Sequence, residues 1–341
     1  MTSVSSTIQR VLPGSALCLA AAGTGYGASL FLPGVSALII TIILGVLLTN
    51  VVQLPGTLSP GIDFSAKKLL RAGIILLGLR LSLTNIVDLG APMLLVIMCI
   101  VACGMLGTVL LGRLLRIPTN LSLLVACGFS ICGAAAVAGA AGVIDPDDEA
   151  EEDTITAVAL VVIFGTLMIP LVPLGANLLG LNAVTAGTWA GGATHEIAQV
   201  VAIGGVIGGG AMAVAVVVKL ARVLLLAPVI AVLSLRQRRL QQSGSIEKQQ
   251  ASHATLPPIV PPFILGFLAM VLLRSFVPLP AILLSTGDVI QTLLLAAAMF
   301  ALGCGVRIKN LLKVGLRPFG LAALSTLLVA TVAYTGIMLT R

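Results

Sequence analysis

Three short clusters of polar residues interrupt the long apolar runs of this sequence, and they are the places where chemistry is expected. They lie at residues 128–139, 191–199 and 219–222. A polar or ionisable side chain in an apolar environment costs free energy unless it is paired, and in membrane proteins such groups mark substrate and ion pathways. Each cluster is therefore a candidate site, and each also has a purely structural interpretation.

The first cluster reads Gly-Phe-Ser-Ile-Cys-Gly from Gly128 to Gly133 and continues in small residues to Gly139. Each glycine disfavours a continuous helix by about 1 kcal/mol, so the pattern predicts a helix that is interrupted near Ser130 and Cys132. The free N–H groups and the positive N-terminus of the following half-helix would favour an anion. The structural alternative is a face of small residues that allows close helix packing.

The second cluster follows a glycine pair at 191–192 and contains Thr194, His195, Glu196 and Gln199. The glycine pair precedes a helical run, so a second interrupted helix is predicted. On a helix His195 and Gln199 would share a face, with Glu196 about 100° away. An adjacent histidine and glutamate can bind or relay a proton. The structural alternative is a buried pair whose polar atoms are satisfied by neighbouring helices.

The third cluster consists of two basic residues, Lys219 and Arg222, which lie three positions apart on one helical face. They are about 12–17 Å from the start of their apolar run, too deep for their side chains to reach the membrane surface easily. We expect one of them to pair with Glu196. Two cations and one carboxylate then leave one positive charge, which an anionic substrate would neutralise. A purely structural ion pair is the alternative.

The composition indicates that lipid is the main solvent of the chain. Of the 341 residues 58% are hydrophobic and only 9% are charged, whereas a soluble domain carries about 25% charged residues. Apolar runs of about 20 residues predict membrane-spanning helices. The predicted fold class is an all-α membrane protein with about eleven transmembrane helices, in a single transmembrane transporter domain over residues 1–341. The expected spans are 11–32, 36–52, 68–87, 92–112, 121–144, 154–179, 188–207, 211–235, 259–277, 288–306 and 316–340.

Basic residues are distributed unevenly between the expected loops. With the N-terminus in the cytoplasm, the inside loops hold most of the Lys and Arg residues, and the outside ends hold only Arg80, Arg274 and Arg341. This excess predicts an inner-membrane protein with a cytoplasmic N-terminus and a periplasmic C-terminus. It also accounts for the net charge of +7 without a nucleic-acid partner. The polar stretch 236–258 is predicted to be a flexible cytoplasmic linker.

Two stretches of the chain share the spacing of a few residues. Leu77-Gly78, Asn85 and Gly90 recur as Leu302-Gly303, Asn310 and Gly315, at a constant offset of 225. The repeat-related segments are about 71–115 and 296–340, and they begin in the third and the tenth expected spans. An odd number of crossings separates these two spans, so they run in opposite directions. The spacing therefore predicts an inverted-topology repeat, which is common among secondary transporters.

In this order and combination, the clusters resemble the YeiH-like sulfate exporter family of bacterial membrane proteins, over nearly the whole chain. The resemblance is carried by the Ser-Ile-Cys-Gly core at 130–133, the His-Glu-Ile-Ala-Gln-Val stretch at 195–200 and the Val-Lys-Leu-Ala-Arg-Val-Leu stretch at 218–224. It implies a fold similar to those of bile-acid and sodium–proton transporters, with two discontinuous helices that cross in mid-membrane. It also implies export of sulfate or a related small anion.

The expected function is a secondary transporter that exports sulfate, or a related small oxyanion or sulfonate, by alternating access at a mid-membrane site. A proton or a sodium ion is the expected coupling ion, with His195 and Glu196 as coupling residues, and neither a cofactor nor a metal is expected. The expected partners are a small inorganic or organic anion and the lipid bilayer, with a homodimer as an open option. The expected substrate-binding residues are Ser130, Cys132, Gly133, Thr194, His195, Gln199, Lys219 and Arg222.

Two other classes of function are weighed against this one. A cation–proton antiporter on the same architecture is the alternative. Such proteins place carboxylates where the discontinuous helices cross. Here Glu196 is the only acidic residue found near mid-membrane, whereas two basic residues, Lys219 and Arg222, lie there. An intramembrane enzyme is not expected, because the chain has neither a nucleophile–base pair nor a metal motif such as His-Glu-x-x-His. The six cysteines fall in apolar runs and are interpreted as small packing residues.

Overall fold

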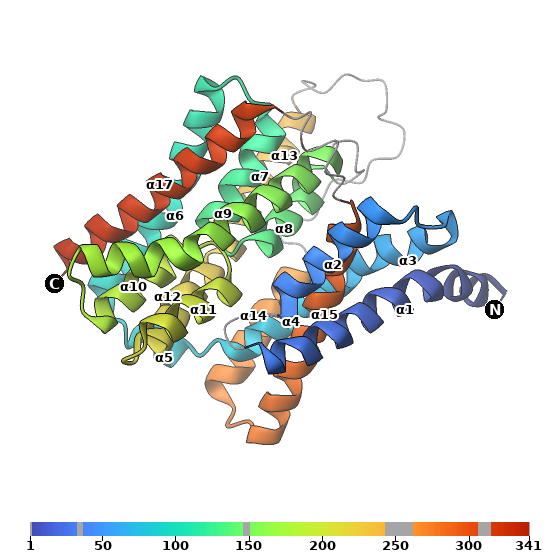
Figure 1. Cartoon of the computed structure of the whole chain (residues 1–341), viewed down its shortest axis with the longest axis horizontal. Coiled ribbons are helices and arrows are strands. Elements are labelled where there is room, and N and C mark those ends of the chain that lie inside the picture. Colours follow the sequence, from blue (N-terminus) through green and yellow to red (C-terminus); the bar gives the residue numbers. More distant parts are fainter. Residues whose placement is uncertain (1, 33–36, 146–150, 243–261, 306–314, 341) are drawn as a thin grey trace.

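A computed structural model describes residues 2–32, 37–145, 151–242, 262–305 and 315–340 of the chain. Every regular element within these ranges is helical (Figure 1). The first half contains α1 (Thr2–Phe31), α2 (Ala37–Val51), η1 (Gly56–Leu58), α3 (Ser59–Phe64), η2 (Ser65–Leu69), α4 (Leu70–Leu77), η3 (Gly78–Arg80), α5 (Leu83–Val87), α6 (Gly90–Leu114), α7 (Thr119–Ser130), α8 (Ala134–Ile144) and α9 (Glu151–Leu178). The second half contains α10 (Ala183–Ala193), α11 (Ile197–Ile207), α12 (Ala211–Leu224), α13 (Leu226–Gln242), α14 (Pro262–Phe276), α15 (Ala281–Gly305) and α17 (Leu316–Leu339).

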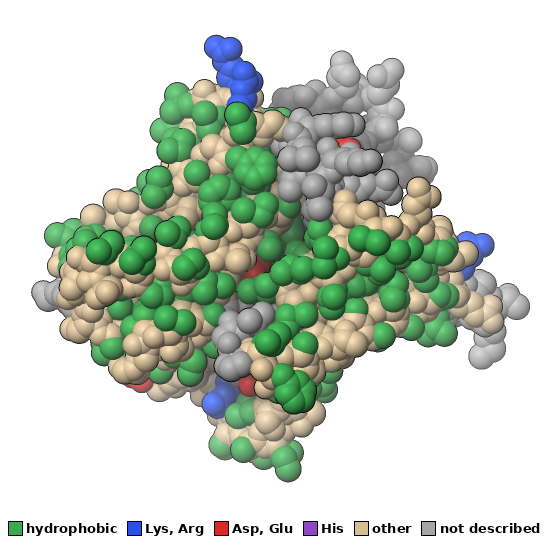
Figure 2. Space-filling model, viewed as in Figure 1, with side chains coloured by type: hydrophobic (Ala, Val, Ile, Leu, Met, Phe, Trp, Pro, Cys, Tyr) green, Lys and Arg blue, Asp and Glu red, His purple; other side chains and the backbone are tan. Residues whose placement is uncertain are grey.

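The exterior of the molecule is suited to lipid. Within the described ranges, α6, α9, α15, α17 and the nearly continuous pair α12–α13 are long and apolar enough to cross a membrane. Large apolar side chains on these helices point outward, such as Leu106 and Leu178, which are 74% and 79% exposed. Figure 2 shows hydrophobic side chains across the visible face, with Lys and Arg side chains at its margins. Soluble monomers rarely expose apolar patches of this extent, so the chain is a multi-pass membrane protein.

The helices form two groups that meet along α4, α8 and α15. Figure 1 shows α6, α7, α9, α10 and α17 on one side and α1, α2, α3, α4 and α15 on the other. In the second group, Cys18, Ala22 and Phe300 belong to a buried cluster between α1, α2 and α15. In the first group, a separate cluster joins α6, α10 and α17. The largest cluster continues from α4 through α8 to α7 and α12, and it holds the two groups together.

Two predicted segments differ from the structure. The expected span 68–87 is not one helix, because the chain leaves the helix after Arg80 and is extended at Leu81 and Ser82 before α5 begins. The N–H group of Leu83 then donates to the Ser275 hydroxyl, 3.0 Å away, instead of to a carbonyl of its own helix. The predicted linker 236–258 begins as helix, since α13 continues to Gln242. Its first residues are mostly Arg and Gln, which are good helix formers; residues 243–258 lie outside the described ranges.

The helices that follow the two repeat-related spans lie side by side. Gly336 lies against Val96, Gly104 lies against Val329, and Thr108 donates a 3.0 Å hydrogen bond to Ser325. The residue numbers rise on α6 as they fall on α17, so the two helices are antiparallel. Gly90 and Gly315, at the start of each helix, have φ angles of +80° and +82°. The second copy of the repeated asparagine, Asn310, lies outside the described residues.

Candidate functional site

The first interruption separates α7 from α8, as the glycine pattern predicts. Helix α7 ends at Ser130, and α8 begins at Ala134 after three non-helical residues. Gly133 has a φ of +80° and a ψ of −139°, a backbone region that is used mainly by glycine and costs other L-residues about 1–3 kcal/mol. A Cβ atom at Gly133 would also overlap the side chain of Glu196. Glycine at this position therefore permits both the break and the close approach of the second interruption.

The second interruption separates α10 from α11. Helix α10 ends at Ala193, and α11 begins at Ile197, so Thr194, His195 and Glu196 are not helical. The prediction that His195 and Gln199 share a helical face is therefore wrong. Glu196 has an extended backbone, with φ −120° and ψ 150°, and is the N-cap residue of α11. Its N–H donates to Oε1 of Gln199 over 3.1 Å, which fixes the first turn of the half-helix.

Arg222 joins the carboxyl ends of α7 and α10. Its guanidinium donates to the carbonyl oxygens of Phe129, Ser130, Gly191, Gly192 and Thr194, at distances between 2.6 and 3.1 Å. Four of these carbonyls belong to the last residues of the two half-helices, and the fifth belongs to Thr194, the C-cap residue of α10. Carbonyls at a helix C-terminus have no partner within their own helix. A cation is favoured there because the C-terminus of a helix carries a partial negative charge.

Lys219 completes the same arrangement one turn earlier on α12. Its Nζ donates to the Ile131 carbonyl at 2.8 Å and to the Thr194 carbonyl at 2.7 Å. Like Arg222, it has no exposed surface. The expected pairing of one of these cations with Glu196 is not found, since neither forms an ion pair with that carboxylate in the described part of the chain. Backbone carbonyls that would otherwise be unpaired take the donors of both cations instead.

Glu196 lies at the opposite, positive ends of the half-helices. Its Oε1 accepts a 3.1 Å hydrogen bond from the N–H of Ala134, the first residue of α8. Because Glu196 also precedes α11, a single carboxylate lies beside the N-termini of both second half-helices. Negative charge is stabilised at this position by the free N–H groups and the helix dipole. Each charged side chain of the crossing is thus at the helix end of opposite sign.

His195 is buried inside the protein, and its hydrogen-bond partners differ from those of Glu196. Its Nδ1 lies 3.3 Å from the Phe129 carbonyl, and its Nε2 lies 3.1 Å from Oγ1 of Thr326 on α17. The ring also packs against Phe129, with 4.4 Å between the ring centroids. Both nitrogens are therefore occupied and the side chain is fully buried.

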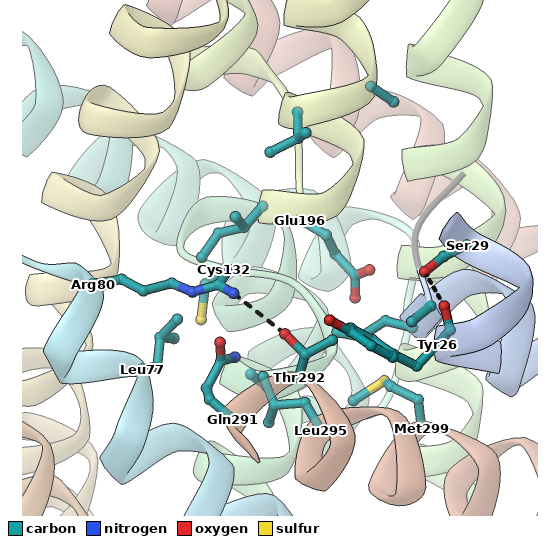
Figure 3. Close-up of a pocket in the computed structure, with 16 residues that line it drawn as sticks. Tyr26, Ser29, Leu77, Arg80, Cys132, Glu196, Gln291, Thr292, Leu295 and Met299 are labelled. Carbon is teal, nitrogen blue, oxygen red and sulfur yellow. Dashed lines mark hydrogen bonds between the residues drawn. The ribbon is translucent and has the colours of Figure 1, made fainter. Parts of the chain in front are cut away.

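A cavity of about 280 Å³ leads to the crossing from the boundary between the two groups of helices. This is well above the roughly 10–15 Å³ that is needed to admit a water molecule. Cys132 and Glu196 lie at its wall on the side of the interrupted helices, facing α4 and α15 (Figure 3). The remaining polar lining residues are Tyr26, Ser29, Arg80, Gln291 and Thr292.

The polar residues across the cavity from Glu196 form hydrogen bonds with one another, but these bonds do not use all of their donor and acceptor atoms. Arg80 donates from Nε to Asp288, 2.8 Å away, and from Nη2 to Oγ1 of Thr292, 3.2 Å away (Figure 3). Gln291 is 97% buried, since only 3% of its surface is exposed. Its Oε1 has no hydrogen-bond partner among the described residues. A buried polar atom without a partner costs about 1–3 kcal/mol, so Gln291 marks this wall as a place for a polar ligand.

The sequence-predicted residues come together, but most of them do not reach the cavity. All of them lie at or beside the two interruptions, yet only Cys132 and Glu196 line the cavity wall. Ser130, Thr194, His195, Lys219 and Arg222 lie behind that wall with no exposed surface, and Gln199 is equally buried. Gly133 provides the turn that brings Glu196 to α8.

Sequence reasoning missed the residues on the opposite wall. Arg80, Gln291 and Thr292 come from the third and tenth expected spans, which form the repeat-related pair. A signal for them existed: Arg80 is one of only three basic residues at the expected outside ends, and Gln291 and Thr292 interrupt an apolar run. The rule that polar groups at membrane depth are functional candidates applies to them as well.

A second, smaller cavity of about 130 Å³ lies at the other end of α4, near Arg71, Asp145 and Phe263. Only a short segment of each shared helix separates it from the first cavity. The nearest residues that line the two cavities are Leu77 and Ile74 on α4, Ala135 and Ala138 on α8, and Met299 and Leu302 on α15. Each pair is three residues apart, which corresponds to about 4.5 Å along a helix.

The charges at the crossing do not cancel. In their ordinary ionised forms, Lys219 and Arg222 carry two formal positive charges and Glu196 carries one formal negative charge. The two carboxyl ends and two amino ends of the half-helices contribute roughly −0.5 and +0.5 each and offset one another. About one positive charge remains inside the protein. No group of three or more His, Cys, Asp or Glu residues within the described ranges is arranged to hold a metal ion.

Comparison with known proteins gives relatives along the whole chain. A family profile described as Conserved hypothetical protein 698 matches residues 13–322. A UPF0324 membrane protein of Corynebacterium glutamicum is 57% identical over 98% of this chain and 94% of the relative. UPF0324 membrane proteins of Pseudomonas aeruginosa and Agrobacterium fabrum are 39% and 35% identical, over 98% and 97% of this chain and 95% and 94% of those relatives. No solved structure matches the chain.

Proposed function

The chain belongs to the UPF0324 family of membrane proteins, the family of the YeiH-like proteins, and from this premise we propose that it is a secondary transporter of a small oxyanion. The proposed substrate is sulfate or a related sulfur oxyanion or sulfonate. The proposed mechanism is alternating access at the crossing of α7–α8 and α10–α11. In this proposal the protein lies in the bacterial inner membrane, with its N-terminus in the cytoplasm.

One observation carries the preference for an anion. The cavity reaches the N-terminus of α8 at a crossing that keeps about one positive charge, because two buried cations face a single carboxylate. In a surrounding of low dielectric constant, this surplus charge favours a negative ligand far more than it would in water. Arg80, on the opposite wall of the cavity, adds a guanidinium of the type that binds oxyanions in bidentate fashion.

Two further features support transport by alternating access. The antiparallel contact of α6 with α17, which are related by an offset of 225 residues, fits an inverted-topology repeat of about eleven spans. The two cavities lie at opposite ends of α4 and are separated by less than one helical turn on three helices. A small displacement of one group of helices against the other would exchange the openings.

The alternative is a cation–proton antiporter, and a specific observation favours it. The cavity wall at the crossing offers a carboxylate, Glu196, while Lys219 and Arg222 lie behind that wall. A carboxylate open to a cavity can bind a proton or a metal cation in turn. The two functions differ in the sign of the transported ion, which makes them separable by one assay.

The test is counterflow of radiolabelled sulfate in liposomes that contain the purified protein. We expect unlabelled sulfate inside to drive uptake of labelled sulfate, with sulfite, thiosulfate and small sulfonates as competitors. Arg80→Gln should reduce the flux by about tenfold or more, the effect of losing one charge-assisted hydrogen bond. Arg274→Gln, which removes a cation of the same type away from the cavity, is the matched control and should leave the flux unchanged.

The same liposomes distinguish the alternative. If no oxyanion shows counterflow while a sodium or potassium gradient moves protons, the protein is a cation–proton antiporter. If neither an oxyanion nor a cation moves, or if sulfate flux is equal in Arg80→Gln and Arg274→Gln, the cavity is not the transport site.

A further inference from the structure

We propose that Glu196 acts as an internal carboxylate that occupies the anion-binding position at the N-terminus of α8, and that an oxyanion replaces it only when Glu196 takes up a proton. The inference rests on the proposed function and adds the coupling ion and the direction of coupling. One proton travels with each anion, in the same direction. The coupling residue is Glu196 alone, without His195.

The geometry places a carboxylate where an oxyanion would bind. Glu196 Oε1 accepts the N–H of Ala134, which is the first free donor of an eleven-residue half-helix. The main chain at Gly133 approaches the Glu196 side chain so closely that no Cβ fits between them. A substrate oxygen and the Glu196 oxygen would therefore compete for the same donor and the same space.

The same carboxylate is open to the cavity. Glu196 is 7% exposed and lines the cavity wall together with Cys132. Figure 3 shows its oxygens pointing into the space between α15 and the interrupted helices. Water and protons from the cavity can reach this side chain, whereas His195 has no exposed surface and both its ring nitrogens already have partners.

Displacement of Glu196 without a proton is unfavourable for two reasons. An ionised carboxylate that loses the Ala134 N–H would remain buried beside a second negative charge. The nearby cations cannot compensate it, because Lys219 and Arg222 donate to backbone carbonyls of α7, α10 and the interruptions. A proton on Glu196 removes the repulsion and releases the N–H group for the substrate.

An independent observation indicates that this cavity has a position for a hydrogen-bond donor of a ligand. The buried Gln291 directs its amide into the cavity from α15, and Oε1 has no partner among the described residues (Figure 3). An acceptor of this kind requires an O–H or N–H group. Hydrogen sulfite brings such a group near neutral pH and sulfate does not, so within the proposed substrate class we expect sulfite to bind more tightly than sulfate.

The charged and titratable groups that face Glu196 fit this assignment. Lys219 of α12 and Cys132 of the first interruption interact electrostatically with Glu196, and Arg222 interacts in the same way with Cys132. Tyr26 of α1 and Arg80 of η3 lie across the cavity. Arg80 is paired with Asp288. Among the described residues that line the cavity, Glu196 is the only carboxylate that could exchange a proton with the substrate.

The first experiment uses the unaltered protein in detergent, with inorganic sulfate and sulfite as probes. Titration calorimetry in two buffers of different ionisation enthalpy gives the number of protons taken up per anion bound. We expect about one proton, with binding that tightens about tenfold for each unit of lower pH while Glu196 is ionised in the free protein. Binding with no proton uptake and no pH dependence overturns the inference but leaves the proposed function intact.

The second experiment follows protons and anions together in liposomes, with a pH-sensitive dye inside and the voltage clamped by potassium and valinomycin. Sulfate added outside should acidify the interior of wild-type liposomes. Glu196→Gln should keep labelled-sulfate counterflow and lose the acidification, because its side chain carries no titrating proton. Asp88→Asn, which removes an exposed carboxylate away from the cavity, should behave like the wild type.

The outcomes separate the two proposals. Acidification that persists in Glu196→Gln overturns the role of Glu196, while sulfate flux in the wild type still supports an anion transporter. Absence of flux for every anion in the wild type contradicts the proposed function itself. If Glu196→Gln does not fold, the proton count from calorimetry on the wild type decides the question.

Discussion

At the scale of single residues, the centre of the protein shows how buried charge can be satisfied without an opposite side chain. Arg222 is fully buried and donates to five backbone carbonyls. A helix interruption creates these carbonyls, and they would be unpaired in an apolar interior without a donor. The interruption and the cation therefore depend on each other: neither is tolerable alone at this depth.

Replacement of Arg222 should accordingly unfold the crossing. Arg222→Leu removes the guanidinium donor from the carbonyls of Ser130, Gly191 and Gly192, at a cost of about 1–3 kcal/mol each in the worst case. The carbonyls of Phe129 and Thr194 keep their contacts with His195 and Lys219. Arg222→Lys keeps the positive charge but lacks the planar guanidinium with its five N–H donors, so we expect a stability between those of the wild type and Arg222→Leu. Thermal unfolding monitored by size-exclusion chromatography should rank wild type above Arg222→Lys and Arg222→Lys above Arg222→Leu. Arg113→Leu, at an exposed arginine, is the control, and equal loss in both leucine variants would contradict the assignment.

Gly133 is the second residue whose identity is dictated by its position. Gly133→Ala meets a strained φ of +80° and overlap with Glu196, so we expect loss of stability of about 1–3 kcal/mol and weaker anion binding. Gly205→Ala, in α11, meets no atom within 4 Å and should be neutral or stabilising by about 1 kcal/mol. Thermal shift of the two purified variants checks this prediction; an undisturbed Gly133→Ala variant would contradict it.

At the scale of elements, the sequence predicts the interruptions but not the roles of the residues around them. Glycine clusters in apolar runs located both breaks to within a few residues, because helix propensity is a local property. The partners of Lys219 were not predictable, because every residue has a backbone carbonyl and the sequence does not indicate which ones accept a hydrogen bond. The carboxylate of Glu196 is visible in the sequence, and it was therefore expected as the partner. The cavity wall was missed for a related reason: Arg80 and Gln291 come to line the same cavity as Glu196 only in the folded arrangement of the helices.

The antiparallel pair α6–α17 offers a quantitative test of helix packing. Thr108 and Ser325 form a fully buried hydrogen bond of 3.0 Å between these helices. A double-mutant cycle with Thr108→Val and Ser325→Ala should give a coupling of about 0.6 kcal/mol, the average for such bonds in membranes. Unfolding in mixed detergent measures it. A coupling near zero would mean that the two side chains do not face each other.

At the scale of the whole molecule, two groups of helices share a boundary that contains both cavities. One group carries the interrupted helices, and the other presents Arg80 and Gln291 to them. The predicted topology assigns the end of α4 near Arg80 to the periplasm and the end near Arg71 to the cytoplasm. The larger cavity, which reaches Glu196, would then open outward.

Cysteine labelling in cells checks this orientation. In a background without the native cysteines, a membrane-impermeant maleimide should label Asp88→Cys from outside and should label Asn120→Cys only after the membrane is broken. Asp88 lies between α5 and α6, Asn120 lies in the first turn of α7, and both are exposed, so their accessibility to water is comparable. The reverse pattern would invert the assignment of the two cavities.

The short segment between the cavities has an electrical consequence. Water in each cavity would bring the electrical potential of the adjacent solution to the inner end of that cavity. Most of the membrane voltage would then fall across about 4.5 Å of α4, α8 and α15. An ion complex with one net charge that crosses this segment then moves through nearly the whole voltage, which is worth about 2.3 kcal/mol per 100 mV. Sulfate flux should therefore change by up to about 50-fold over 100 mV of imposed potassium potential. A flux that does not depend on voltage would mean either that the electric field is spread over the full thickness of the bilayer or that the transported complex is neutral.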